Sequence, residues 1–486
     1  MAKNRILVPF PMYQSLKTVS RTTSSLALAM ALALALSACS SLLPSPPPPA
    51  SIAPQWLAPL PHQGSVGGLS LWWQQQGDPL LVSLIEAAQR QSPTVAKAAM
   101  RIEEARANQA LANSALLPNL NAQIGSTRGV SQVGIPVATS TQLGVLSSWE
   151  LDVVGANSAV SKASVAQVEG SQAQWHEARV SVAAEVANVY FSLFGCRQMQ
   201  ALAQGDAQSH QETARLIAIN AKAGFVAESI AALARANAAD SNSRWTQQTG
   251  QCEILTKSLV VLTAMPEAEL KARLQKSFEQ PKKALPFAVP SVPAQTITQR
   301  PDVYSAERDL VVAAAQVASA KAQRLPRLSL NGSIGALRVG TGGVEQDEST
   351  WSFGPLTLSL PLFDGSRRVA AVTASESAYQ SAIVGYQFKV RNAVREVEEA
   401  LVNLNSSQAR ETDSQVASQG YGQSLAATQA RFNQGMASVV ELEDARRNAY
   451  AAHSALLALQ MQRNLAWVAL YRAVGGGFEP QQSNVN

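Results

Sequence analysis

The chain has 486 residues, of which 46% are apolar and 15% are charged, and it contains only three cysteines. This composition is too apolar for a disordered protein and too poor in cysteine for a disulfide-rich secreted module. The longest apolar run, Leu26–Leu36, has 11 residues, whereas a membrane-spanning helix needs about 20. A polytopic helical membrane protein is therefore excluded.

The positive charge of the chain comes from its N-terminus. Residues 1–38 hold four of the 39 basic residues and none of the 34 acidic residues, so the rest of the chain carries 35 basic and 34 acidic residues. Once this segment is removed, the net charge gives no reason to expect a nucleic-acid partner.

The same segment has the pattern of a secretory signal. A basic start, the apolar run and small residues predict a signal peptide over residues 1–38. The run ends in the letters LSAC, which resemble a bacterial lipobox; this resemblance implies cleavage before Cys39 and acylation of that residue. Several acyl chains, at about 0.8 kcal/mol per buried CH₂, would anchor the protein stably. The alternative is an ordinary signal with a chance cysteine near the cut.

The lipid on Cys39 is the only covalent addition that we expect, and no cofactor is predicted. Residues 39–75 form the predicted lipid anchor and a proline-rich, extended tether.

An internal repeat organises the remainder of the chain. Residues 93–118 and 301–326 have the same length, both begin and end with proline, and are offset by 208 residues. Gly224 and Gly435 are offset by 211 residues, which is nearly the same distance. Constant offsets at separate landmarks predict a tandem duplication. We assign the first repeat to residues 76–280, a linker to 281–300, the second repeat to 301–475 and a tail to 476–486.

Each repeat contains two segments in which apolar and polar residues alternate, the period of a β-strand. These segments are residues 119–127 and 141–151 in the first repeat, and 327–337 and 351–363 in the second. Glycine-, serine- and threonine-rich loops are expected between them. A length of about 10 residues suits a tilted transmembrane strand.

Long proline-free tracts follow the strands and carry apolar residues at three- and four-residue spacing, which predicts helices. Splitting each tract at its glycine gives helices 153–223, 226–265, 366–434 and 437–473. A helix of 70 residues is about 105 Å long.

Four strands cannot form a closed barrel, because known barrels begin at about eight strands. Lipid offers no hydrogen bonds to an open sheet edge. The sequence therefore predicts an obligate oligomer in which several chains share one barrel.

Several motifs occur together in a family-specific order. They are the lipobox, Trp72-Trp73, Asp78-Pro79-Leu80, Ile102–Ala107, Leu117-Pro118 and the twofold repeat. In this order they resemble the outer-membrane efflux factors of the TolC/OprM/NodT type over residues 65–475. The resemblance implies a mainly α chain with a membrane β-barrel portion.

In that family three chains form a homotrimer with a 12-stranded barrel in the outer-membrane lipid of a Gram-negative bacterium. An α-helical barrel continues it through the periplasm. The resemblance also implies two partners at the lower end, a periplasmic adaptor protein and an inner-membrane pump.

The resemblance further implies a gate at the periplasmic end of the second repeat. Asp444 lies where the family has an acid in a Leu-Asp-Ala stretch, Glu441 is one turn away, and Phe432 occupies a position that is often aromatic. Around a threefold axis, such acids would form a cation-selective ring. The alternative is that they only solvate the outside of a helix.

Cys196 and Cys252 lie 28 residues before and after Gly224. The helical hairpins are expected to turn at Gly224 in the first repeat and at Gly435 in the second. In the antiparallel hairpin that turns at Gly224, two residues equally far from the turn stand at the same height. An oxidising periplasm then favours a disulfide; the alternative is two small core residues with different neighbours.

No motif predicts an enzyme, and the four histidines lack metal-ligand spacing. We interpret the chain as a passive outer-membrane exit duct for small molecules or drugs, gated at its periplasmic tip. The alternatives are an outlet for protein secretion of the same architecture and a non-porous periplasmic lipoprotein scaffold.

Overall fold

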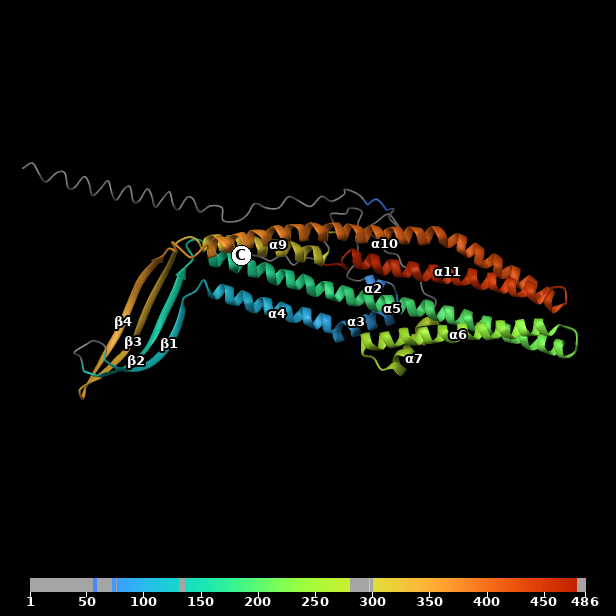
Figure 1. Cartoon of the computed structure of the whole chain (residues 1–486), viewed down its shortest axis with the longest axis horizontal. Helices are drawn as coiled ribbons and strands as arrows, with labels where there is room; N and C mark the ends of the chain where they lie inside the picture. The colour runs from blue at the N-terminus through green and yellow to red at the C-terminus, as the bar shows by residue number, and fades with distance from the viewer. Residues whose placement is uncertain are drawn as a thin grey trace, which may run out of the picture. The chain divides into compact units, whose positions relative to one another are not determined.

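The computed structural model of the chain describes residues 56–58, 72–75, 77–130, 136–279, 297 and 300–478 (Figure 1). The predicted lipidation site Cys39, most of the tether, most of the linker 281–300 and the tail beyond residue 478 lie outside the described residues. The chain forms two compact units, one around residues 109–164 and 311–380, the other in the described parts of 48–108, 165–310 and 381–486.

One order of elements occurs twice along the chain. The first series is α4 (Pro93–Ser114), β1 (Asn119–Gly129), β2 (Ala138–Leu151), α5 (Ala156–Lys222) and α6 (Glu228–Thr263). The second is α9 (Pro301–Ala322), β3 (Arg327–Thr341), β4 (Val344–Ser359), α10 (Arg367–Asn433) and α11 (Val439–Ala473). The helices of the first series have 22, 67 and 36 residues, and those of the second have 22, 67 and 35.

Among the described residues, the second unit has three further helices: α2 (Trp72–Gln75), α3 (Pro79–Gln91) and α7 (Glu267–Phe278). The helix α7 was not anticipated as a separate element. It follows a break at which Ala264 takes a left-handed conformation with φ 54° and ends α6, and Pro266 then precedes the new helix.

In the first unit, the four strands form one antiparallel sheet in the order β1-β2-β3-β4. The expected strand 351–363 is wrong at both ends, because β4 runs from Val344 to Ser359. Most of the expected loop 338–350 is strand. Gly342 and Gly343, with φ 58° and 90°, make a two-residue turn of the kind that suits the twist of a hairpin, so the polar residues around them remain paired.

The two faces of this sheet differ in chemistry. One cross-strand row joins Ala122, Val145, Ile334 and Trp351. The neighbouring row, on the opposite face, joins Gln123, Gly144, Gly335 and Thr350. On the first face, Ile334 and Trp351 are 66% and 79% exposed, so no described residue of this unit covers these two side chains.

The core of the second unit gathers residues from α3, α5, α6, α7, α10 and α11. Tyr190 is fully buried, and its hydroxyl lies 2.7 Å from Asp78 Oδ2 and 2.9 Å from Ser277 Oγ. Asp78 also caps α3 by accepting from the Leu81 N–H. The motif Asp78-Pro79 therefore starts a helix and anchors it to α5 at once.

The tryptophan pair of the sequence also belongs to this core. Trp72 stacks on Tyr471 with 4.9 Å between ring centroids, and Trp73 meets the same ring edge-on at 4.7 Å. Both indoles are buried, so these aromatic contacts fasten the short helix α2 to the end of α11.

Two helical hairpins dominate the second unit (Figure 1). The first hairpin is α5 with α6, and the second hairpin is α10 with α11; in each, the two helices lie side by side. The expected helix bounds differ from the observed ones by at most three residues. Both hairpins turn at the expected glycines, where φ is 78° at Gly224 and 76° at Gly435.

Candidate gate at the hairpin ends

The two hairpin ends have the same backbone geometry. The N–H of Gly224 donates to Ala221 O and the next N–H donates to Asn220 O, both at 3.0 Å. At Gly435 the corresponding acceptors are Phe432 O at 2.9 Å and Arg431 O at 2.8 Å. This pair of bonds is a Schellman motif, which needs a left-handed residue after the helix. Glycine adopts that conformation without a steric penalty.

A small apolar cluster joins the two hairpins close to these turns. Its buried members are Ile217, Ala231, Ala234 and Val439, and Phe432 is partly buried against them. The predicted gate residue Phe432 thus packs inside its own chain. Contact between the hairpins here rests on small and aliphatic side chains, so the apolar area that holds them together is modest.

The structure does not bring the two predicted gate acids together. Asp444 forms an ion pair with Arg447 three residues along α11, and its side chain is 55% exposed. Glu441 caps the start of α11, where its Oε2 accepts from the Ser438 N–H at 2.7 Å. The backbone N–H of Ser438, then its hydroxyl and Arg431, hold the pKa of Glu441 below its usual value. Each acid therefore has a local partner and also faces open space.

The acid between them is the buried one. Glu443 Oε2 lies 2.9 Å from His210 Nδ1, and Glu443 Oε1 lies 3.0 Å from an Arg446 guanidinium nitrogen. On the other side of the ring, His210 Nε2 lies 3.4 Å from Asp206 Oδ1. These four side chains form a polar network between α5 and α11.

The sequence motifs did not predict this network. The spacing of Asp206, His210 and Thr213 on α5 places them on one helix face, and that pattern was the available signal. Their partners on α11, Glu443 and Arg446, are more than 230 residues away in the chain, so no local pattern could connect the two sets.

Burial and charge act in opposite directions on His210. Burial disfavours the charged imidazole, but the hydrogen bonds and charges of Asp206 and Glu443 outweigh it and raise the pKa of His210 from 6.5 to about 9. Burial likewise opposes the charge of Asp206, and His210 and Arg244 prevail and lower the pKa of its carboxyl. The imidazole is therefore charged at neutral pH.

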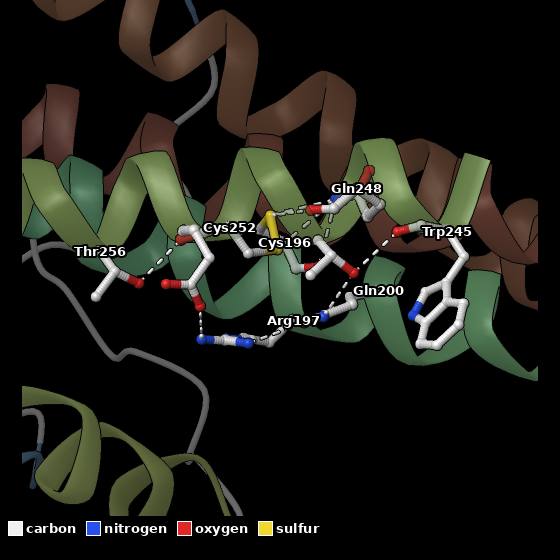
Figure 2. Close-up of a disulfide and its surroundings, with 9 residues drawn as sticks. Cys196, Arg197, Gln200, Trp245, Gln248, Cys252 and Thr256 are labelled. Atoms are coloured by element: carbon white, nitrogen blue, oxygen red, sulfur yellow. Dashed lines mark hydrogen bonds and ion pairs between the residues drawn. A yellow bond between two sulfur atoms is a disulfide. The ribbon is translucent and has the colours of Figure 1, made fainter. Parts of the chain in front are cut away.

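Further along the first hairpin, Cys196 and Cys252 are joined in a disulfide with Cα atoms 5.7 Å apart (Figure 2). The neighbouring turns add polar contacts between the same helices. Gln200 donates to Thr249 Oγ1 at 3.0 Å, and Arg197 lies 3.5 Å from Glu253. A covalent bond flanked by these contacts fixes the register of α5 against α6.

Within the residues that the structure describes, no helix has both the length and the apolar character needed to cross a membrane. Over the same residues, no group of three or more His, Cys, Asp or Glu side chains is placed to hold a metal ion.

The described chain thus combines a four-stranded sheet that has an exposed apolar face with two hairpins of very long paired helices. A family model described as "Outer membrane efflux protein" matches residues 84–264 and 292–476. The chain belongs to this family.

Individual relatives agree with this assignment. The chain is 29% identical over 453 residues to outer membrane protein OprJ of Pseudomonas aeruginosa, covering 90% of this chain and 93% of that protein. A crystal structure of a membrane protein from Pseudomonas aeruginosa covers 92% of this chain with a TM-score of 0.80 and 27% identity. The CmeC outer membrane channel of Campylobacter jejuni, 23% identical over 91% of the chain, has the same fold with a TM-score of 0.81.

Proposed function

We propose that this protein is the outer-membrane exit duct of a tripartite efflux system and passively exports small molecules. The observation that carries the proposal is the sheet of the first unit. Its strands β1 and β4 have no partner on their outer sides within the described chain, and one of its faces presents exposed aliphatic and aromatic side chains. Such an apolar face can lie against lipid, but lipid offers no hydrogen bonds to the unpaired backbone groups of the two edge strands.

Both needs are met if identical chains add their sheets edge to edge. Three copies of a four-stranded sheet would give 12 strands, with the row that contains Ile334 and Trp351 facing lipid and the row that contains Gly144 and Gly335 facing the lumen. The recurring series of elements supports a duplicated origin of the two halves, and a homotrimer would then surround its lumen with six helical hairpins.

The family assignment supports the place of the duct in the outer membrane of a Gram-negative bacterium, with helices that extend into the periplasm. Acylation of Cys39 would add a second attachment to the same membrane. The hairpin ends would be the docking point for a periplasmic adaptor and, beyond it, an inner-membrane pump. Asp444, Glu441 and Phe432 would surround the closed tip.

The test uses the mature, acylated protein purified from membranes. We expect a trimer that survives detergent electrophoresis unless heated, and stepwise conductance when it is added to planar lipid bilayers. A monomer without conductance would contradict the pore and would favour a non-porous helical scaffold. A stable trimer that conducts would support the duct whatever its cargo.

A further inference from the structure

A cavity of about 730 Å³ lies in the second unit, and side chains from four helices line it. Five of these side chains are charged: Lys97 and Arg101 from α4, Glu177 from α5, Asp309 from α9 and Lys389 from α10. Cavities of about 300–1,000 Å³ are large enough to hold a drug-sized molecule. The lining therefore surrounds space for a small molecule with charges of both signs.

These five side chains are not paired within the chain. Over the described residues, none of them takes part in an ion pair or in a side-chain hydrogen bond. The sixth charged residue of the lining, Asp302, is instead paired with Arg300 at 2.8 Å. Glu177 is partly buried, so burial and then the charge of Asp302 raise the pKa of its carboxyl, and the charge of Lys389 offsets this only in part. A carboxylate that has lost hydration without gaining a donor favours an added cation beside it.

A smaller cavity of about 540 Å³ in the same unit has the opposite arrangement. Its three charged residues, Glu103, Arg106 and Glu169, are all paired. Glu103 and Arg106 form an ion pair at 2.6 Å, and Glu169 lies 3.1 Å from an Arg308 guanidinium nitrogen. Of these two cavities, only the larger one has several unpaired charges that an incoming molecule could meet.

The two cavities lie on different sides of α5. Arg179 of α5 lies against α3, where its guanidinium is 3.3 Å from Gln89 Oε1. The smaller cavity includes His176, which is one turn from Arg179 and therefore on the same side. Glu177 is two residues from Arg179, and successive residues of a helix point about 100° apart, so Glu177 points to the opposite side. The larger cavity therefore lies on the side of α5 that faces away from α3.

A hollow to which four helices contribute lies on the concave side of their layer. In the proposed trimer, the concave side of each layer of helices faces the lumen. The larger cavity then opens into the path of the exported molecules.

We propose that the larger cavity is a lumen binding site for zwitterionic small molecules in transit, which carry both an ammonium and a carboxylate group. The carboxylate binds Lys97 and Arg101, the ammonium binds Glu177 and Asp309, and Lys389 adds a third positive charge to the rim. This inference rests on the proposed function as an exit duct and adds a substrate class to it. Exposed ion pairs are individually weak, so a bound molecule also leaves, as conduction requires.

The mixture of charges disfavours molecules that carry only one sign. A simple anion meets Lys97 and Arg101 but is repelled by Glu177, and a simple cation meets the reverse combination. A molecule with both groups gains both attractions, and specificity is the difference between these binding free energies.

Two penicillins that differ in one group provide the probes. Near neutral pH ampicillin carries an ammonium and a carboxylate, whereas benzylpenicillin has the same body and only the carboxylate. Each is added to the mature, acylated protein in planar bilayers, where binding in the lumen interrupts the single-channel current. From the frequency and duration of the interruptions, we expect ampicillin to bind about threefold more tightly, because one exposed ion pair changes a binding equilibrium by up to about fivefold.

Two double variants separate the acids from the cations. Glu177→Gln with Asp309→Asn should remove the preference for ampicillin. Lys97→Gln with Arg101→Gln should weaken the binding of both penicillins at least about threefold.

The matched control is Glu103→Gln with Arg106→Gln, which removes an exposed pair of the same helix α4 at the smaller cavity. It should leave both dissociation constants unchanged. Equal binding of the two penicillins to the wild type would overturn the site and leave the duct intact. So would an ampicillin preference that survives in Glu177→Gln with Asp309→Asn.

A second measurement does not depend on conductance: saturation-transfer NMR of ampicillin with the purified protein in detergent. We expect transfer from the wild type and from the control, and at least about half of it to be lost in Lys97→Gln with Arg101→Gln. Absence of transfer from the wild type would refute the site even if the protein formed a conducting pore. Transfer that needs these residues in a protein without conductance would support the site and contradict the duct.

Discussion

Gly335 lies directly opposite Gly144 in the β2–β3 ladder, and the two backbones approach so closely that a Cβ atom on Gly335 would stand 2.4 Å from Leu143 O and 2.8 Å from Gly144 Cα. Real side chains do not make such contacts with backbone atoms. Paired glycines are a known means by which a sheet curves sharply, and the strands of this sheet are visibly bent (Figure 1). The close approach of β2 and β3 at this point thus depends on two residues without side chains.

Gly335→Val is expected to push β2 and β3 apart and to reduce the yield of heat-stable oligomer, since overpacking of this kind costs about 1–3 kcal/mol. The matched control is Gly340→Val on the same strand, where an added Cβ meets Thr139 O at an ordinary 3.9 Å. Detergent electrophoresis with and without heating measures the effect. Equal yields from the two variants would show that the close approach is unimportant.

The two faces of β3 provide a test of which side meets lipid. Ile334 belongs to the exposed apolar row, and its neighbour Ser333 points to the opposite face, where its Oγ lies 2.8 Å from Ser352 Oγ. An arginine on the lipid side of a barrel costs about 2–4 kcal/mol near the bilayer centre, whereas a lumen-facing one is tolerated. Ile334→Arg should therefore impair membrane assembly and Ser333→Arg should not, as measured by the fraction of protein in purified outer membranes. The reverse order would mean that the faces are assigned wrongly.

The disulfide closes a segment whose ends are 56 residues apart in the sequence. A loop of this length corresponds to about 4 kcal/mol in the chain-entropy model, so Cys196→Ser with Cys252→Ser should lower the apparent Tm by about 5–10 °C. Reduction of the wild type should reproduce that shift and should leave the double variant unchanged. A thiol titration of the unreduced mature protein should detect neither cysteine; two reactive thiols would exclude the bond in the native protein.

Conductance and ion selectivity distinguish acids that line the closed tip from acids that only solvate the surface of a helix. Asp444 and Arg447 form an exposed pair three residues apart on α11, and Glu212 and Arg215 form a similar pair on α5 of the first hairpin. If Asp444 and Glu441 line the closed tip, Asp444→Ala with Glu441→Ala should raise the conductance and weaken cation selectivity, because each chain loses two charges from the constriction. The control Glu212→Gln should change neither quantity. Reversal potentials in a salt gradient provide the measurement, and unchanged values in the double variant would remove these residues from the gate.

Local sequence patterns were sufficient for the long helices, the glycine turns and the presence of four strands, because periodicity and turn residues act over a few positions of the chain. The equal distance of Cys196 and Cys252 from Gly224 likewise placed them at the same height in the hairpin, and the disulfide predicted from this is present in the structure. The ends of β4 were not accessible in this way. Its first residues are polar and resemble a loop, and only pairing with β3 makes them a strand.

The roles of the acids in α11 depended on tertiary structure. Glu441, Glu443 and Asp444 are neighbours in sequence and chemically alike, yet one caps the helix, one is buried against His210 and one remains exposed. Successive residues of a helix point about 100° apart, so the position of the neighbouring helix decides which of them is covered. That neighbouring helix is α5. Because α5 lies far from residue 443 in the sequence, the residues around 443 contain no local pattern that predicts the contact. The packing of the two hairpins, and not the composition of either one, therefore decides which acid is buried in the network with His210.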